Sequence, residues 1–81
     1  MKANIYKQLT AIFREIFANK SITLSKDTTA KDIENWDSLT NMILIHAIES
    51  HFKFKFTFRD VVALKNVGEL VEVIEQKIKK S

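Results

Sequence analysis

An acid and a serine, Asp37 and Ser38, stand immediately before the most apolar helical segment of the sequence, in the stretch NWDSLTNMILI at residues 35–45. Two kinds of chemistry suit this pair. Aspartate and serine are both strong helix N-caps, because a side-chain oxygen of either accepts a hydrogen bond from the N–H groups of the first turn. A serine hydroxyl at an exposed helix start is also accessible to a modifying enzyme, and the helix N-terminus favours a phosphodiester there. The residues alone leave both interpretations open.

Other residues with catalytic or metal-binding potential are poorly spaced. His46 and His51 are five residues apart, whereas metal ligands on one face of a helix are three or four apart. A Ser–His–Asp set built from Ser38, His46 and Asp37 fails, because His46 lies roughly 12 Å along the helix axis from Ser38. The sequence has no cysteine nucleophile and no glycine-rich phosphate loop. We therefore expect a protein that is not an enzyme and binds no metal.

Four segments with helical patterns must position the Asp37–Ser38 pair. Apolar residues recur at i, i+4, i+7, i+8, i+11 and i+12 over about residues 4–18, and a second helix should cover about 38–51. The absence of proline and the single glycine favour helices over strands. The sequence therefore predicts an all-α fold, a four-helix bundle with a long first loop and a short third helix.

The two later helices are predicted from capping boxes, in which a polar N-cap and an acid three residues later bond reciprocally to the backbone. Thr57-x-x-Asp60 precedes a short helix at about 58–64. Asn66-x-x-Glu69 precedes a helix at about 67–79, which has one apolar stripe: Val67, Leu70, Val71, Ile74 and Ile78.

The long loop of residues 19–35 is rich in serine, threonine, aspartate and lysine. Loops of this length inside a compact domain tend to be functional. Ile22, Leu24 and Ile33 are predicted to attach it to the core, and residues 30–34 could form one helical turn.

The stretch FKFKFTF at residues 52–58 alternates with period two, which is the period of a β-strand. A lone strand in a helical domain has no pairing partner. We interpret it as an extended segment that places its phenylalanines, up to Phe58, in the core and leaves Lys53 and Lys55 outside.

The second helix is apolar nearly all round. One broad side holds Asn41, Met42, Leu44, Ile45, Ile48 and Phe52, and its Met42, Ile45 and Ile48 are predicted to pack the bundle. The opposite side holds Leu39, Ile43, His46 and Ala47. A helix in a small domain cannot be buried on every side, so either other segments wrap it or one side contacts a partner.

Length and composition limit the function classes. The 81 residues predict a single domain over 1–81, and an apolar fraction of 46% is typical of a folded one. No apolar run approaches the ~18 residues of a membrane span, and no secretory signal is visible, so we expect a cytoplasmic protein. A net charge of +3 spread over both ends of the chain is typical of a solubilising surface.

The stretch WDSLTNMILIHAIESHF at residues 36–52 resembles the second-helix motif of acyl carrier proteins and peptidyl carrier domains. In that family an Asp-Ser-Leu triplet opens the helix, an apolar pattern follows, and an acid plus a phenylalanine close it. The residues in register are Asp37, Ser38, Leu39, Met42, Leu44, Ile45, Ala47, Ile48, Glu49 and Phe52. The tail LKNVGELVEVI at 64–74 is similar to the family's third loop and fourth helix. The resemblance covers essentially the whole chain, and W-D-S-L resembles small stand-alone carriers, including the D-alanyl carriers, more than the fatty-acid type.

This resemblance implies a bundle of the acyl-carrier type and a covalent cofactor. A phosphopantetheinyl transferase would move 4′-phosphopantetheine from coenzyme A to the hydroxyl of Ser38, flanked by Asp37, which orients and caps the site, and by Leu39, which anchors the helix start. The thiol of the arm would hold an acyl or aminoacyl group as a thioester. Further implied partners are an acyl- or aminoacyl-loading ligase and acyl-transferring or condensing enzymes. They would read the side of the second helix formed by Leu39, Ile43, His46 and Ala47.

The second helix also departs from the fatty-acid type, whose carriers are strongly acidic there. Only Asp37 and Glu49 remain acidic, and a usually acidic position is Ile43. Partners with basic patches would gain little from this surface. We therefore expect a dedicated biosynthetic pathway rather than housekeeping fatty-acid synthesis. We also expect a monomer, with no nucleic-acid or membrane partner.

Two alternatives stay open. The first is an unmodified helical adaptor that binds another protein through the Ile43 side of the helix. The second is a small basic nucleic-acid-binding domain, in which Lys53, Lys55 and Arg59 contact the backbone and the neighbouring phenylalanines stack on bases. Such binding would weaken steeply with salt.

Overall fold

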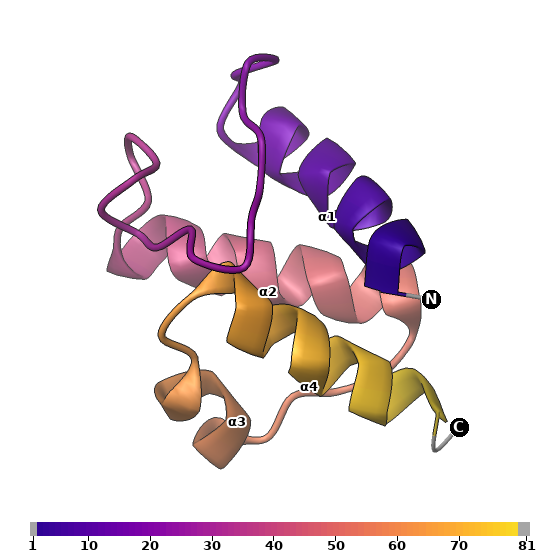
Figure 1. Ribbon diagram of the computed structural model, residues 1–81. Coiled ribbons are helices and arrows are strands. Elements are labelled where there is room, and N and C mark those ends of the chain that lie inside the picture. The colour runs from indigo at the N-terminus through magenta and orange to yellow at the C-terminus, as the bar shows by residue number, and fades with distance from the viewer. Residues whose placement is uncertain (1, 80–81) are drawn as a thin grey trace.

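The computed structural model describes residues 2–79, apart from the side chain of Ala63, and contains four helices: α1 (Lys2–Ile16), α2 (Ser38–Phe52), α3 (Phe58–Ala63) and α4 (Val67–Lys79). Residues 2–79 contain no strand. α1 packs against both α2 and α4, while a long loop runs from the end of α1 to the start of α2 (Figure 1). The predicted all-α bundle with a long first loop and a short third helix is confirmed. No described helix is long and apolar enough to cross a membrane.

The core forms where the apolar stripes of α1, α2 and α4 meet. Two loop residues, Ile22 and Ile33, are buried in it, and Leu24 packs against it, as the sequence predicted. The helical members are Ile5, Leu9, Phe13, Leu44, Ile48, Val67, Leu70, Val71 and Ile74. Burial of Ile22 and Ile33 therefore holds in place the loop that leads to Asp37 and Ser38.

Two predicted helix boundaries were wrong. α1 begins and ends two residues before the predicted 4–18, and its end is set by the turn at Ala18, which has a left-handed φ of 49°. The turn predicted over 30–34 does not become helical. There the Asp32 carboxylate accepts a hydrogen bond of 2.9 Å from the Thr29 N–H, and such local bonds compete with helical ones.

The aromatic segment after α2 is extended, as predicted, but Phe58 does not join the core. α2 ends at Phe52, and the residue that follows it, Lys53, is left-handed with φ 60°. Phe54 and Phe56 are half-buried, and their ring centroids lie 4.8 Å apart. Phe58 is 84% exposed, because Thr57 starts a helix there and breaks the period-two alternation that would have turned Phe58 inward.

Both predicted capping boxes begin a helix, but only the first is reciprocal. The Thr57 hydroxyl accepts from the Asp60 N–H and the Asp60 carboxylate accepts from the Thr57 N–H, each at 3.0 Å. In the second, the Asn66 side chain accepts from the Glu69 N–H at 2.8 Å, while the Glu69 carboxylate accepts from the N–H of Lys65.

The first turn of α4 is also capped by the long loop. The N–H groups of Val67 and Gly68 donate to the carbonyls of Thr28 and Lys26, at 2.8 and 3.0 Å. A Cβ atom on Gly68 would lie 2.8 Å from the Lys26 carbonyl oxygen, so only glycine permits this approach. The loop is therefore fixed to α4 before it reaches the start of α2.

Candidate functional site

Asp37, and not Ser38, caps α2. Its backbone is extended, and its carboxylate accepts hydrogen bonds of 3.0 Å from the N–H groups of Leu39 and Thr40. The Thr40 hydroxyl accepts from the Asp37 N–H at 2.8 Å and donates to the carbonyl of Asn35. These bonds, above all the one from the Thr40 N–H, hold the pKa of Asp37 below its usual 3.8. Asp37 is therefore charged at neutral pH.

Because Asp37 provides the cap, the Ser38 hydroxyl is left available. Ser38 is the first residue of α2 and is exposed. Among residues 2–79, no group forms a hydrogen bond with its side chain, whereas the other first-turn hydroxyl, that of Thr40, is fully engaged. Asp37 already uses two first-turn N–H groups, so the helix N-terminus offers a phosphodiester less than the sequence suggested.

Trp36 and Asn41 fix the start of α2, and sequence reasoning missed both roles. The indole N–H of Trp36 donates to the Asn41 side-chain oxygen at 3.0 Å. The Trp36 ring meets Phe13 of α1 edge-on, with centroids 5.2 Å apart, and also lies near Phe17. The backbone next to Ser38 is thus tied to α1. The signal in the sequence was the chain's single tryptophan, two residues before the serine.

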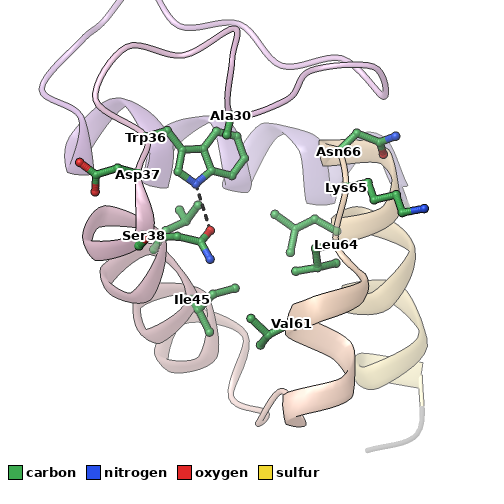
Figure 2. Close-up of a pocket in the computed structure, with 12 residues that line it drawn as sticks. Ala30, Trp36, Asp37, Ser38, Ile45, Val61, Leu64, Lys65 and Asn66 are labelled. Carbon is green, nitrogen blue, oxygen red and sulfur yellow. Dashed lines mark hydrogen bonds between the residues drawn. The ribbon is translucent and has the colours of Figure 1, made fainter.

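A pocket of about 330 Å³ opens beside Ser38, between α2, α3 and the start of α4 (Figure 2). Ile45 of α2 and Val61 of α3 point toward one another across it, and Trp36 lies at the end near Ser38. The complete lining is Ala30, Trp36, Asp37, Ser38, Asn41, Leu44, Ile45, Val61, Leu64, Lys65, Asn66 and Leu70. The pocket is therefore lined by apolar side chains of α2 and α3 and by polar residues both beside Ser38 and at Lys65 and Asn66.

The side of α2 predicted to meet partners is largely accessible. Leu39 is 72% and Ile43 51% exposed, His46 is exposed, and Ala47 is half-buried. Leu39 is therefore too exposed to anchor the helix start through burial within this chain.

Met42 was predicted to pack the bundle, and that prediction was wrong, since it is 63% exposed. The buried side of α2 is centred on Leu44, Ile45 and Ile48. At 100° per residue, Met42 points about 110° away from that centre. It therefore joins the exposed apolar side of α2 with Leu39 and Ile43. Two apolar side chains of α3, Phe58 and Val62, are exposed as well.

Comparison with known proteins identifies the family. A sequence profile described as the phosphopantetheine attachment site matches residues 7–74. The chain belongs to this family. No curated protein sequence shows a significant match. The structure is similar to the solution NMR structure of the holo acyl carrier protein from Geobacter metallireducens, with a TM-score of 0.88 and 43% identity over 93% of this chain and 86% of that one.

Membership of this family settles two expectations. The protein is a carrier of the acyl-carrier-protein type, with covalently attached 4′-phosphopantetheine as its cofactor, and such carrier domains are not themselves enzymes. The start of α2 fits this group chemically, because it combines an accessible hydroxyl with a neighbouring pocket lined by both polar and apolar side chains.

Proposed function

We propose that this chain is an acyl or aminoacyl carrier protein whose phosphopantetheine is attached to Ser38. The observation that carries the proposal is the arrangement at the start of α2, where Asp37 forms the cap and the Ser38 hydroxyl stays exposed and uncommitted. When bound, the cofactor supplies a thiol that holds the cargo as a thioester.

The attachment reaction needs only the serine oxygen from this chain. The Ser38 oxygen forms a bond to the pantetheine-side phosphorus of coenzyme A, and the pyrophosphate P–O bond breaks. Adenosine 3′,5′-bisphosphate leaves, and the hydroxyl proton passes to the transferase. Asp37 contributes by fixing the first turn of α2, and Trp36 contributes by tying that turn to α1.

The proposed partners are a phosphopantetheinyl transferase, an acyl- or aminoacyl-loading ligase, and acyl-transferring or condensing enzymes. Exposure of Leu39, Ile43 and His46 supports docking on this side of α2, to which the half-buried Ala47 contributes less. α2 carries no acid before Glu49, whose carboxylate accepts a hydrogen bond from the backbone of Phe56. An apolar rather than acidic docking side supports a dedicated pathway over housekeeping fatty-acid synthesis. We further propose that the carrier acts in the cytoplasm and as a monomer.

The nucleic-acid alternative loses support from the structure. Lys53, Lys55 and Arg59 are exposed, but Phe54 and Phe56 are half-buried and contact each other. A stacking platform needs successive exposed rings, and of these aromatic residues Phe58 is the exposed one. The adaptor alternative differs from the carrier only in lacking the modification.

Intact-mass spectrometry tests the proposal after incubation with coenzyme A and a broad-specificity phosphopantetheinyl transferase. Wild-type protein should gain one phosphopantetheine, and Ser38→Ala should gain none. Ser50→Ala, which changes an exposed serine near the other end of α2, is the matched control and should be modified like the wild type. Modification of Ser38→Ala would overturn the assignment. Failure of the wild type with each of several transferases would favour the adaptor.

A further inference from the structure

The pocket beside Ser38 has a polar group placed to meet whatever is attached to that serine. Asn41 lines the pocket and follows Ser38 by three residues, which is about 4.5 Å along the helix axis and about 60° around it. A chain that leaves the Ser38 oxygen and enters the pocket therefore passes Asn41 within its first few bonds, long before its far end.

The orientation of the Asn41 amide follows from its partner. An indole N–H only donates, so the Asn41 oxygen faces Trp36 and the NH₂ group lies on the other side of the amide. No protein group in residues 2–79 accepts from this NH₂. Within the same described part of the chain, no buried side-chain nitrogen or oxygen lacks a partner. The NH₂ of this half-buried residue is therefore accessible, and it offers hydrogen-bond donors to the pocket.

One part of the pocket wall is apolar and suits an apolar occupant. Ile45, Val61 and Leu64 line it, and Figure 2 shows Ile45 and Val61 directed into the same space. An occupant that matches both parts combines a hydrogen-bond acceptor with branched apolar carbon close to the serine. A plain alkyl chain would cover the Asn41 NH₂ without accepting from it, which is unfavourable for a desolvated polar group.

The arm proposed on Ser38 has this chemistry in its first segment. Next to the phosphodiester, its pantoyl unit carries a carbon with two methyl groups, then a hydroxyl and an amide carbonyl. The methyl groups match the wall of Ile45 and Val61, and the hydroxyl and carbonyl oxygens match the Asn41 donors. The thiol and any cargo lie farther along the arm.

We propose that the pocket seats the pantoyl segment of the arm and that Asn41 is the positioning residue that holds it. This inference rests on the proposed attachment at Ser38. A seated pantoyl unit restricts the directions in which the rest of the arm and its thiol can extend. The cargo is then held near α2 and α3 and does not sample all directions around Ser38. Trp36, which binds the same Asn41 amide, then reports on the seat.

NMR of the ¹⁵N,¹³C-labelled holo protein tests the seat directly, with the apo protein as reference. In the holo form, the Asn41 side-chain NH₂ signals should shift, and nuclear Overhauser contacts should join the methyl groups of Ile45 and Val61 to the pantoyl methyls. Unchanged NH₂ signals without such contacts would overturn the inference. In an octanoyl-loaded sample, contacts from these two residues to the acyl chain and not to the pantoyl methyls would overturn it too, because cargo would then be the occupant.

Variants separate the seat from a purely structural role. Asn41→Asp keeps an oxygen acceptor for Trp36 but removes the donor, and Asn41→Leu removes the donor without adding charge. The seat should also make Trp36 fluorescence differ between holo and apo wild-type protein. Both holo variants should lose that difference and the pantoyl contacts. Ser50→Asp, which adds the same charge at the other end of α2, should keep them. Retention of both signals in the two Asn41 variants would refute the role of Asn41.

The two proposals fail in distinguishable ways. Intact mass shows whether the arm is attached before any NMR measurement is made. Absence of the arm contradicts attachment at Ser38 and removes the basis for a seat. A correct holo mass without pantoyl contacts contradicts the seat alone.

Discussion

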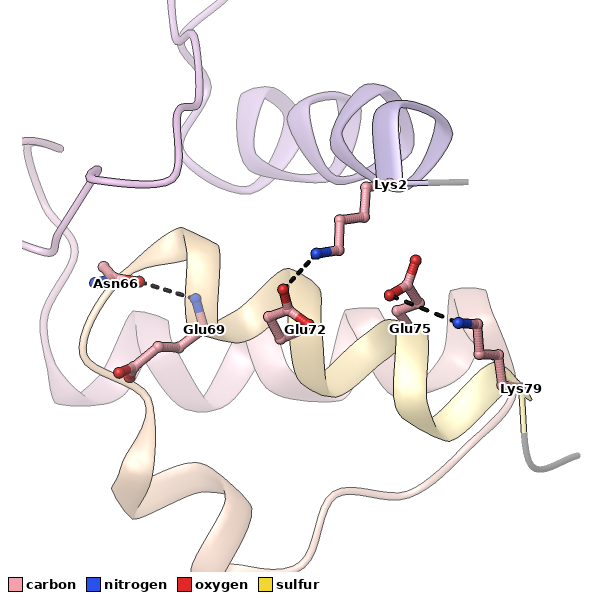
Figure 3. Close-up of polar contacts among 6 residues, drawn as sticks. All are labelled: Lys2, Asn66, Glu69, Glu72, Glu75 and Lys79. Carbon is pink, nitrogen blue, oxygen red and sulfur yellow. Dashed lines mark hydrogen bonds and ion pairs between the residues drawn. The ribbon is translucent and has the colours of Figure 1, made fainter.

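α2 and α4 use their apolar residues differently. In α4 the apolar stripe that faces the core is buried: Val67, Leu70, Val71 and Ile74. Its outer side is charged, and Glu72 pairs with Lys2 of α1 while Glu75 pairs with Lys79 (Figure 3). α2 buries Leu44, Ile45 and Ile48 but leaves three further large apolar side chains exposed: Leu39, Met42 and Ile43.

This difference separates residues that fold the protein from residues that serve another purpose. The pattern of α4 is explained by core formation and a polar surface. The exposed apolar residues of α2 gain little from burial within this chain, and clustered apolar exposure marks interaction surfaces. Three measurements test which residues stabilise the fold and which serve docking.

The largest effect is expected from a matched pair of leucines on α2. Leu44 is fully buried, so Leu44→Ala should lower the free energy of unfolding by about 2–5 kcal/mol. Leu39 is 72% exposed, so Leu39→Ala should change it by less than about 0.5 kcal/mol. Urea denaturation followed by circular dichroism measures both. Similar losses for the two variants would show that the whole of α2 belongs to the core.

A smaller effect distinguishes the caps of the two helices by pH. The pKa of Asp37 is below 3.8 in the folded protein, so its charged form stabilises the fold, and this contribution is present at neutral pH and lost as pH falls through the folded-state pKa. Asn66, which caps α4, has no charge to lose. The drop in Tm caused by Asp37→Ala should therefore shrink between pH 7 and about pH 3, whereas the drop caused by Asn66→Ala should not. Equal behaviour of the two variants over that range would contradict the assigned roles.

The smallest effect on stability should accompany a clear effect on docking. Ile43→Ser changes a side chain that is 51% exposed, so we expect a change in Tm of no more than a few degrees. The rate of phosphopantetheine transfer to the variant should fall several-fold, because an apolar contact with the transferase is lost. Gln76→Ser, an exposed substitution on α4, is the control and should alter neither quantity. Unchanged transfer kinetics for Ile43→Ser would place the docking surface elsewhere.

The local features of this protein followed from sequence patterns. The four helices, the cap at Thr57 and the attachment of the loop through Ile22 and Ile33 depend on residue type and spacing over a few positions, and the structure has them. The family resemblance rested on the motif around Ser38 together with the pattern at residues 64–74, and the comparisons confirmed it.

Tertiary packing decided what neighbouring residues alone could not. Because α2 is apolar nearly all round, its periodicity placed Ile45 and Ile48 correctly in the core but did not show where the buried side stops, and only the positions of α1 and α4 left Met42 outside. The sequence pattern alone also allowed Phe58 to continue the extended segment into the core. In the structure it is instead the first residue of the capped α3 and points outward.

The site itself shows the same division. By sequence alone, Asp37 and Ser38 were a cap, an attachment point or both, since either side chain has a suitable oxygen. The fold resolved the cap, because Trp36 packs on α1 and Thr40 bonds to Asn35, which orients the Asp37 carboxylate toward the first turn. Asn41 gained its role only when α3 and α4 closed a pocket around it. A sequence determines which groups a helix offers, but the contacts between helices determine which of those groups remain free.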